Sequence, residues 1–80
     1  MQYVYIFKSS DGTYYTGCTN HLDDRLKRHN AGYVEYTKDK LPVELVFYCV
    51  FQDKHMAFVF EQYLKTGSGI AFRNKRLIKY

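Results

Sequence analysis

Two stretches of the sequence have the apolar spacing of a helix, and each places an ionisable side chain on the face that should be apolar. At about 100° per residue, one arc of the first stretch holds Leu22, Arg25, Leu26 and His29. One face of the second stretch holds Ala57, Phe60, Glu61 and Leu64. Gln62 and Lys65 turn away from this face. An unpaired charge on a buried face costs several kcal/mol. Arg25 and Glu61 therefore indicate either a polar cleft with a chemical task or a buried ion pair between them.

The composition is that of a small globular domain. The chain has 80 residues, of which 46% are hydrophobic, so we expect a single domain over residues 1–80 with one modest core. It has no apolar run of about 18 residues and no amino-terminal signal segment, so we expect a cytoplasmic protein without a membrane partner. Cys18 and Cys49 lack the spacing of zinc ligands and are expected to be reduced.

The basic side chains are unevenly spread. The net charge is +4, and one basic cluster near the carboxyl end comprises Arg73, Lys75, Arg76 and Lys79. Lys38 and Lys40 lie in an expected loop. Such clusters suit a polyanion, because each neutralised phosphate releases counterions. On charge alone, an ordinary solvated surface is equally compatible with them.

The first part of the chain predicts a β-hairpin followed by a helix. Residues 3–7 and 13–16 are rich in β-branched and aromatic side chains, and Asp11-Gly12 between them is a turn sequence. Alternation along the first strand places Tyr3, Tyr5 and Phe7 on one face and Val4 and Ile6 on the other. Asn20 is expected to cap a helix over residues 21–30.

The second part predicts a strand and two further helices. Residues 44–51 are apolar at nearly every position, as expected for a strand covered on both faces, so helices should lie on both sides of the sheet. Asp53 is expected to cap a helix that runs to about Lys65, and Gly67-Ser68-Gly69 to break it. A last helix would start at Ile70, with one stripe formed by Ile70, Asn74, Leu77 and Ile78.

Several of these residues occur in an order typical of one protein family. Tyr3-Val4-Tyr5 and Tyr15-Thr16-Gly17 are followed by a helix with Arg25, a later helix with Glu61, and Asn74. In this order the chain resembles the GIY-YIG nuclease superfamily. It is most similar to small single-domain bacterial members that resemble the amino-terminal nuclease domain of UvrC, the incision component of the bacterial excinuclease. Tyr3 and Thr16 depart from the named motif, but neither departure removes a side chain expected to react.

The resemblance implies a fold and a reaction. The implied fold class is α+β, a small three-stranded antiparallel sheet flanked by helices in the order β-β-α-β-α-α. The implied activity is that of a metal-dependent endonuclease, which hydrolyses DNA phosphodiester bonds with a single divalent ion, Mg²⁺ or Mn²⁺. With no room for a sequence-reading domain, we expect nicking with a structure or single-strand preference, a role in DNA repair or recombination, and a protein partner that directs the enzyme.

The resemblance also implies roles for individual residues. Glu61 matches the metal ligand, and Arg25 matches an arginine that holds a phosphate oxygen. Tyr5 matches a tyrosine that acts as general base or orients the attacking water, although an unperturbed tyrosine pKa near 10 keeps it protonated at neutral pH. Tyr15 would hydrogen-bond the phosphate or the water. His29 would accept a proton from Tyr5 or hold Tyr15 in place.

Supporting and binding residues complete the prediction. Gly17 is expected to keep a side chain from crowding the site, and Asn74 either to lie near the metal or to have a structural role. The residues expected to contact nucleic acid are Thr37, Lys38, Lys40, Arg73, Lys75 and Arg76. Two other functions stay open: a nucleic-acid-binding module on the same fold that does not cut, and a structural domain with a buried Arg25–Glu61 pair.

Overall fold

The computed structural model describes residues 1–78, so Lys79 of the basic cluster lies outside the described residues. Seven elements follow one another along the chain: β1 (Gln2–Lys8), β2 (Tyr14–Thr19), α1 (Leu22–Asn30), β3 (Glu44–Phe51), α2 (Lys54–Leu64), α3 (Gly67–Phe72) and the π-helical η1 (Arg73–Leu77). The predicted α+β class and the order of strands and helices are confirmed. None of the helices described here has the length and apolar character needed to cross a membrane.

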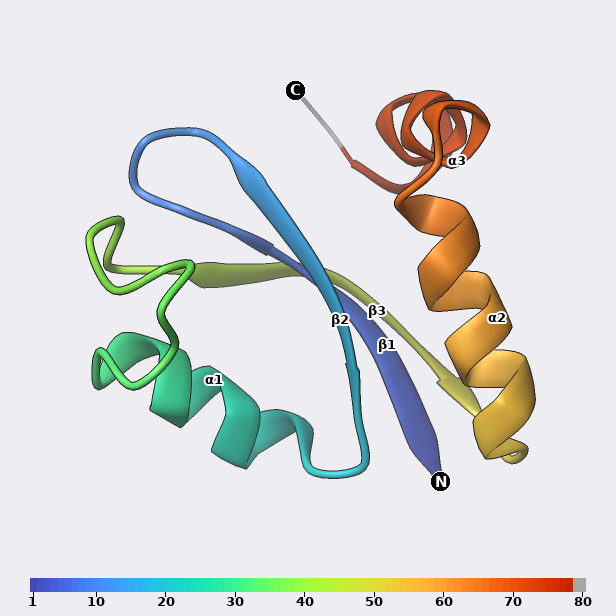
Figure 1. The fold of residues 1–80 in the computed structure, drawn as a ribbon, viewed down its shortest axis with the longest axis horizontal. Coiled ribbons are helices and arrows are strands. Elements are labelled where there is room, and N and C mark those ends of the chain that lie inside the picture. The colour runs from blue at the N-terminus through green and yellow to red at the C-terminus, as the bar shows by residue number, and fades with distance from the viewer. Residues whose placement is uncertain (79–80) are drawn as a thin grey trace.

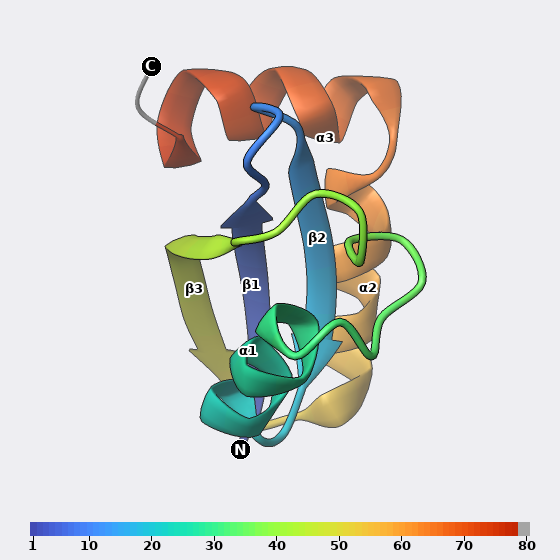
Figure 2. The ribbon, with the colours of Figure 1, turned by 90° about the vertical axis from the view of Figure 1, so that its left-hand side faces the viewer.

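A three-stranded antiparallel sheet lies at the centre of the molecule, with strand order β2-β1-β3. Helix α1 covers one face of the sheet and α2 covers the other, while α3 runs across one end (Figures 1 and 2). Helices on both sides of the sheet were predicted, and the structure confirms them.

Strand β1 separates two apolar layers because its side chains alternate between the two faces of the sheet. Tyr5 and Phe7 are fully buried toward α1, where they pack with Val43. Val4 is fully buried on the opposite face, where it packs with residues of α2. The predicted alternation along the first strand is therefore confirmed.

The prediction that residues 44–51 form a strand covered on both faces was wrong. β3 is an edge strand with alternating exposure, and three of its apolar side chains are exposed: Val46, Tyr48 and Val50. The strand that is covered on both faces is β1, which has a partner on each side. A continuous apolar run identified a strand correctly, but it does not fix the place of that strand in the sheet.

Helix caps follow the prediction at one helix and not at the other. The Asp53 carboxylate accepts a hydrogen bond from the backbone N–H of His55 at 2.9 Å, as predicted. At α1 the Asn20 side chain makes no cap. The backbone N–H of His21 instead donates to Thr19 Oγ1 at 3.1 Å, and no side chain caps the helix.

The Gly67-Ser68-Gly69 segment starts a helix, which corrects the predicted break. Thr66 Oγ1 accepts a hydrogen bond from the backbone N–H of Gly69 at 3.0 Å and so caps α3. Further on, the N–H of Ile78 bonds to the carbonyl of Arg73 at 3.0 Å, five residues back, which is the π-helical spacing. Ile70 is exposed, while Ile78, which follows η1 in an extended conformation, is buried, so the predicted stripe does not form.

Gly69 and Gly67 form a matched pair for a stability test. A Cβ atom on Gly69 would lie 2.5 Å from the Tyr63 carbonyl carbon and 2.8 Å from Leu64 Cα. Apart from its chain neighbours and its own helix backbone, one on Gly67 would meet nothing within 4 Å in residues 1–78. We expect Gly69→Ala to lower the free energy of unfolding by about 1–3 kcal/mol, because backbone must move. Gly67→Ala should be neutral or stabilising by up to about 1 kcal/mol. Urea denaturation measures both, and equal effects would contradict this account.

Candidate active site

One cleft brings together four of the side chains predicted to be catalytic. Its volume is about 330 Å³, and its lining includes Tyr5 from β1, Tyr15 and Gly17 from β2, Arg25 from α1 and Glu61 from α2. These residues are distant in sequence, and the four elements converge at the β2 side of the sheet. The structure therefore collects two phenols, a guanidinium and a carboxylate in one place.

Gly17 makes room for the Tyr5 side chain. The two residues are direct partners in the pairing of β1 with β2, so their side-chain positions lie next to each other. A Cβ atom on Gly17 would lie 2.5 Å from Tyr5 Cζ and closer still to the hydroxyl oxygen. The expected crowding is confirmed, and the group that would be displaced is the phenol of Tyr5 itself.

The Tyr5 hydroxyl lies in a strongly desolvating environment. The residue is fully buried, and among the described residues the hydroxyl oxygen has no hydrogen-bond partner. Burial raises the pKa of Tyr5 well above 10, Tyr15 and Glu61 add to this increase, and the positive charge of Arg25 opposes it. Tyr5 is therefore a neutral phenol at pH 7, suited to orienting a water or phosphate oxygen by hydrogen bonding.

Glu61 is held by two neighbours on its own helix. Its side chain is nearly buried, Lys65 Nζ lies 2.6 Å from Oε2, and Gln62 Nε2 donates to Oε1 at 2.9 Å. Gln62 and Lys65 are exposed, as predicted for residues turned away from the apolar face, but their polar ends reach back to the carboxylate. Among residues 1–78 no ion pair joins Arg25 to Glu61, which removes the structural-domain reading built on that pair. The four-residue spacing of Glu61 and Lys65 was the sequence signal for the observed pair.

His29 lies deeper than the cleft residues. It is fully buried, its ring packs against Tyr15 at 5.0 Å and Phe7 at 4.8 Å, and Nδ1 lies 2.8 Å from Thr37 Oγ1. Burial and the nearby Arg25 charge lower the pKa of His29, so the ring is neutral at pH 7. His29 contacts Tyr15, as one of its two predicted roles requires, but makes no hydrogen bond to Tyr5 in this structure.

The residues predicted to contact nucleic acid divide into three groups. Thr37 is fully buried against His29, so its predicted place among the surface contacts was wrong. Lys38 pairs with Glu35 at 3.1 Å, and Lys40 lies 4.2 Å from the centre of the Tyr36 ring, so both lie on the surface of the loop. The basic residues that continue from α3 lie at or near the surface: Arg73, Lys75 and Arg76.

Asn74 is separated from the cleft. Its side-chain oxygen accepts a hydrogen bond from Arg73 Nε at 3.1 Å, and Asn74 does not line the cleft that holds Glu61. Of the two predicted roles, the structure shows a local structural one. The cleft lining also includes a residue that the sequence did not single out, Lys54 in the first turn of α2.

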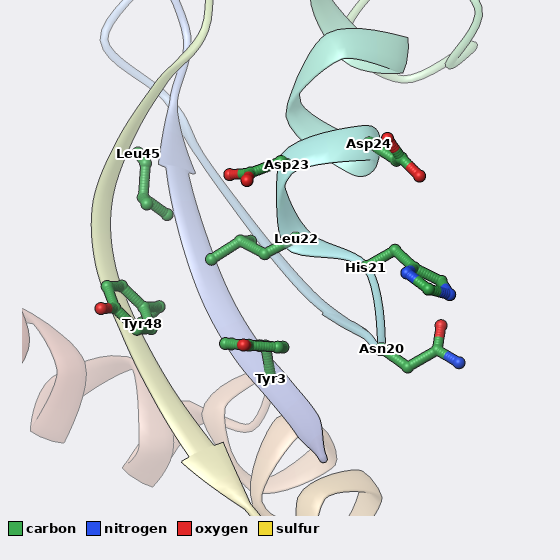
Figure 3. A pocket seen from close by; sticks show the side chains of 8 residues that line it. All are labelled: Tyr3, Asn20, His21, Leu22, Asp23, Asp24, Leu45 and Tyr48. Carbon is green, nitrogen blue, oxygen red and sulfur yellow. The ribbon is translucent and has the colours of Figure 1, made fainter.

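A larger hollow of about 500 Å³ lies between α1 and β3, away from these residues (Figure 3). Tyr3, Leu22, Leu45 and Tyr48 lie around it, together with Asp23 at the start of α1. It includes none of the residues predicted to be catalytic, and its carboxylates would repel a phosphate. We therefore place the candidate active site in the smaller cleft.

The fold is a three-stranded antiparallel sheet with helices on both faces. Its cleft contains two tyrosines, an arginine and a glutamate. Together they place the protein in the class of small α+β nuclease domains. Residues 1–74 match the family model described as the GIY-YIG catalytic domain. The chain belongs to the GIY-YIG family. Its closer likeness to UvrC stays a prediction.

Similar proteins occur in several bacteria. The chain is 46% identical over 78 residues to a UPF0213 protein of Clostridium perfringens, with 96% of this chain and 80% of that protein covered. A UPF0213 protein of Bacillus cereus is 42% identical over 62 residues, which cover 76% of this chain and 65% of that protein. The solution NMR structure of the UPF0213 protein BH0048 from Bacillus halodurans has a TM-score of 0.56 and 34% identity, over 90% of this chain and 81% of that one.

The surroundings of Glu61 lead to a stability prediction. Lys65 is about half exposed (49%), so water can solvate its ammonium group when the carboxylate is removed. We expect Glu61→Ala to change the free energy of unfolding by less than about 1 kcal/mol. Breaking a fully buried ion pair would instead cost about 3–5 kcal/mol. Chemical denaturation in EDTA distinguishes the two values, and a loss in the larger range would show that Glu61 has a structural role.

Proposed function

We propose that this protein is a metal-dependent endonuclease that hydrolyses DNA phosphodiester bonds. The observation that carries the proposal is the meeting of Tyr5, Tyr15, Arg25 and Glu61 in one cleft of a GIY-YIG domain. Phosphodiester hydrolysis needs an oriented water, charge stabilisation at the phosphate and help for the leaving oxygen. The cleft offers groups for the first two of these tasks.

The side chains of the cleft take complementary roles. Arg25 holds a phosphate oxygen with its planar guanidinium and balances the negative charge that grows in the transition state. Tyr5 is neutral, and its hydroxyl, which has no hydrogen-bond partner in the described part of the chain, orients the attacking water. Tyr15, on the neighbouring strand, hydrogen-bonds the same water or the phosphate. Gly17 keeps the space that the Tyr5 hydroxyl needs.

Glu61 is the residue that would hold a single Mg²⁺ or Mn²⁺ ion. Among residues 1–78, no group of three or more histidine, cysteine, aspartate or glutamate side chains could hold a metal by itself. A lone carboxylate fits Mg²⁺, which keeps several waters and takes other ligands from substrate phosphate. When bound, such an ion would supply Lewis-acid stabilisation of the phosphate and lower the pKa of a coordinated water. For this, Lys65 must release a Glu61 oxygen, and its exposure permits that movement.

Basic residues at the surface suit the binding of DNA without sequence reading. Lys38 and Lys40 on the loop and Arg73 after α3 can meet phosphates, and the exposed Tyr36 ring can stack on an unpaired base. We therefore propose nicking with a preference for single-stranded or branched DNA, in repair or recombination, with a partner protein that selects the site. A binding module that does not cut is the second candidate, because the same basic surface would serve it.

Cleavage assays separate the two candidates. End-labelled single-stranded, duplex, flapped and four-way DNA are incubated with Mg²⁺, Mn²⁺ or EDTA. We expect metal-dependent cutting that falls by about a hundredfold or more in Tyr5→Phe and in Glu61→Ala, because each removes a group at the reacting phosphate. Tyr33→Phe and Glu35→Ala are the matched controls, since both residues are exposed and lie outside the cleft lining.

Each outcome of these assays has a definite meaning. Loss of cutting in the two cleft variants, with retention in the two controls, would support the endonuclease. Salt-sensitive binding of DNA without cleavage under any of these conditions would favour the binding module.

The Lys65–Glu61 pair gives a separate test of the metal site. In Lys65→Met the carboxylate loses its ammonium partner, so we expect Mn²⁺ to bind about two- to fivefold more tightly, equivalent to about 0.5–1 kcal/mol. Electron paramagnetic resonance of free Mn²⁺ measures this without DNA. Lys75→Met, which removes the same charge at an exposed position outside the cleft lining, is the control. An equal change in both variants would point to net charge instead of the pair.

A further inference from the structure

Thr37 and His29 form a buried polar pair beneath the cleft. Both side chains are fully buried, and His29 Nδ1 lies 2.8 Å from Thr37 Oγ1. The pair joins the middle of the loop between α1 and β3 to the last turn of α1. Asn30 closes the base of that loop, because its side chain makes two hydrogen bonds to the backbone of Val43, at 2.8 and 3.2 Å.

The pair also lies next to a residue of the candidate active site. The His29 ring packs on Tyr15, which lines the cleft. On the loop, Tyr36 precedes Thr37 and packs on the same tyrosine, with its ring centre 5.4 Å from that of Tyr15. The Thr37–His29 bond therefore helps to fix two of the rings that contact Tyr15.

The donors and acceptors of the two side chains indicate which nitrogen of His29 carries the imidazole proton. One hydrogen is shared between Nδ1 and the Thr37 oxygen, and within residues 1–78 the Thr37 hydroxyl has no other hydrogen-bond partner. If Nδ1 carried the proton, the hydroxyl hydrogen would stay buried with no acceptor. Such an orphan donor is costly, and the Nε2 lone pair would be left without a donor among the described residues as well.

The second arrangement places the imidazole proton on Nε2 of His29. If the Thr37 hydroxyl donates to Nδ1, the imidazole proton lies on Nε2, which has no partner in the structure. The ring that carries Nε2 packs on Tyr15, a residue of the cleft lining. This arrangement leaves one group of the pair unsatisfied among the described residues, the Nε2–H, whereas the other arrangement leaves two.

We propose that Thr37 is a positioning residue that holds His29 in the Nε2–H tautomer, so that His29 serves the cleft as a hydrogen-bond donor. In this state Nδ1 is occupied and Nε2 has no lone pair free, so His29 does not take the proton of Tyr5. The direction of the Thr37–His29 bond is inferred from the hydrogen-bond partners of the pair and does not depend on the nuclease function. Its catalytic consequence rests on the proposed nuclease function.

Nuclear magnetic resonance of the imidazole nitrogens tests the tautomer without DNA. The full chain is labelled with ¹⁵N, long-range ¹H–¹⁵N correlations are recorded at neutral pH, and His29→Gln identifies the His29 signals. We expect Nε2 of His29 to carry the proton in the wild type and in Thr37→Ser, which keeps a hydroxyl. In Thr37→Val, which keeps the shape but removes the hydroxyl, the His29 ring should lose this single tautomer. The exposed His21 and His55 are internal references and should not change.

Cleavage rates of the same proteins complete the test. We expect Thr37→Val to cut DNA at least about tenfold more slowly than the wild type, and Thr37→Ser to recover most of that loss. A proton on Nδ1 in the wild type, or an unchanged tautomer in Thr37→Val, would overturn the proposal. If Thr37→Val does not fold, the wild-type and Thr37→Ser spectra still decide it. If no protein cuts DNA, the proposed nuclease fails, while the spectra still report the tautomer.

Discussion

The apposition of Tyr5 and Gly17 is the constraint on which the rest of the site depends. Tyr5 is on the central strand, where a neighbour on each side fixes its register, and its pairing partner on β2 is a residue without a side chain. The phenol can therefore pass over β2 toward Arg25 and Glu61. A strand register is a rigid element, because a slip of one residue would turn Tyr5 to the other face. The geometry of the cleft is thus set by backbone pairing.

Charges in the cleft and at the basic surface have partners close to them in the sequence. Glu61 forms an ion pair with Lys65, one helical turn away, and Lys38 forms one with Glu35 on the same loop. Arg73 donates a hydrogen bond to the adjacent Asn74. Partners of this kind include at least one flexible side chain that reaches solvent, and they exchange readily with water or with an incoming phosphate. The cleft can therefore keep a carboxylate and an arginine close together without joining them in a permanent pair.

The sequence predicted most of the site because periodicity and motif order agree there. Alternation along the first strand gave the orientation of Tyr5, and helical spacing gave those of Arg25 and Glu61, all of which the structure brings into one cleft. It could not predict features that depend on the sheet order or on non-standard turns. β3 is as apolar as a central strand yet lies at an edge, and Ile78 lies beyond the end of η1, so it does not share a helical stripe with Asn74. Thr37 was misplaced because neither its burial nor its hydrogen bond to His29 has a local sequence signal.

Most of the buried polar atoms that lack hydrogen-bond partners belong to rings around Tyr15. Among the described residues, three buried side-chain atoms have no hydrogen bond, and two of them are Tyr5 Oη and His29 Nε2. Both belong to rings that pack on Tyr15. A domain optimised for stability alone would have replaced these groups by phenylalanine or leucine, because an unsatisfied buried donor costs about 1–3 kcal/mol. Two unsatisfied polar groups next to Tyr15 have a physical reason if a bound ligand completes the hydrogen bonds that the folded chain leaves open.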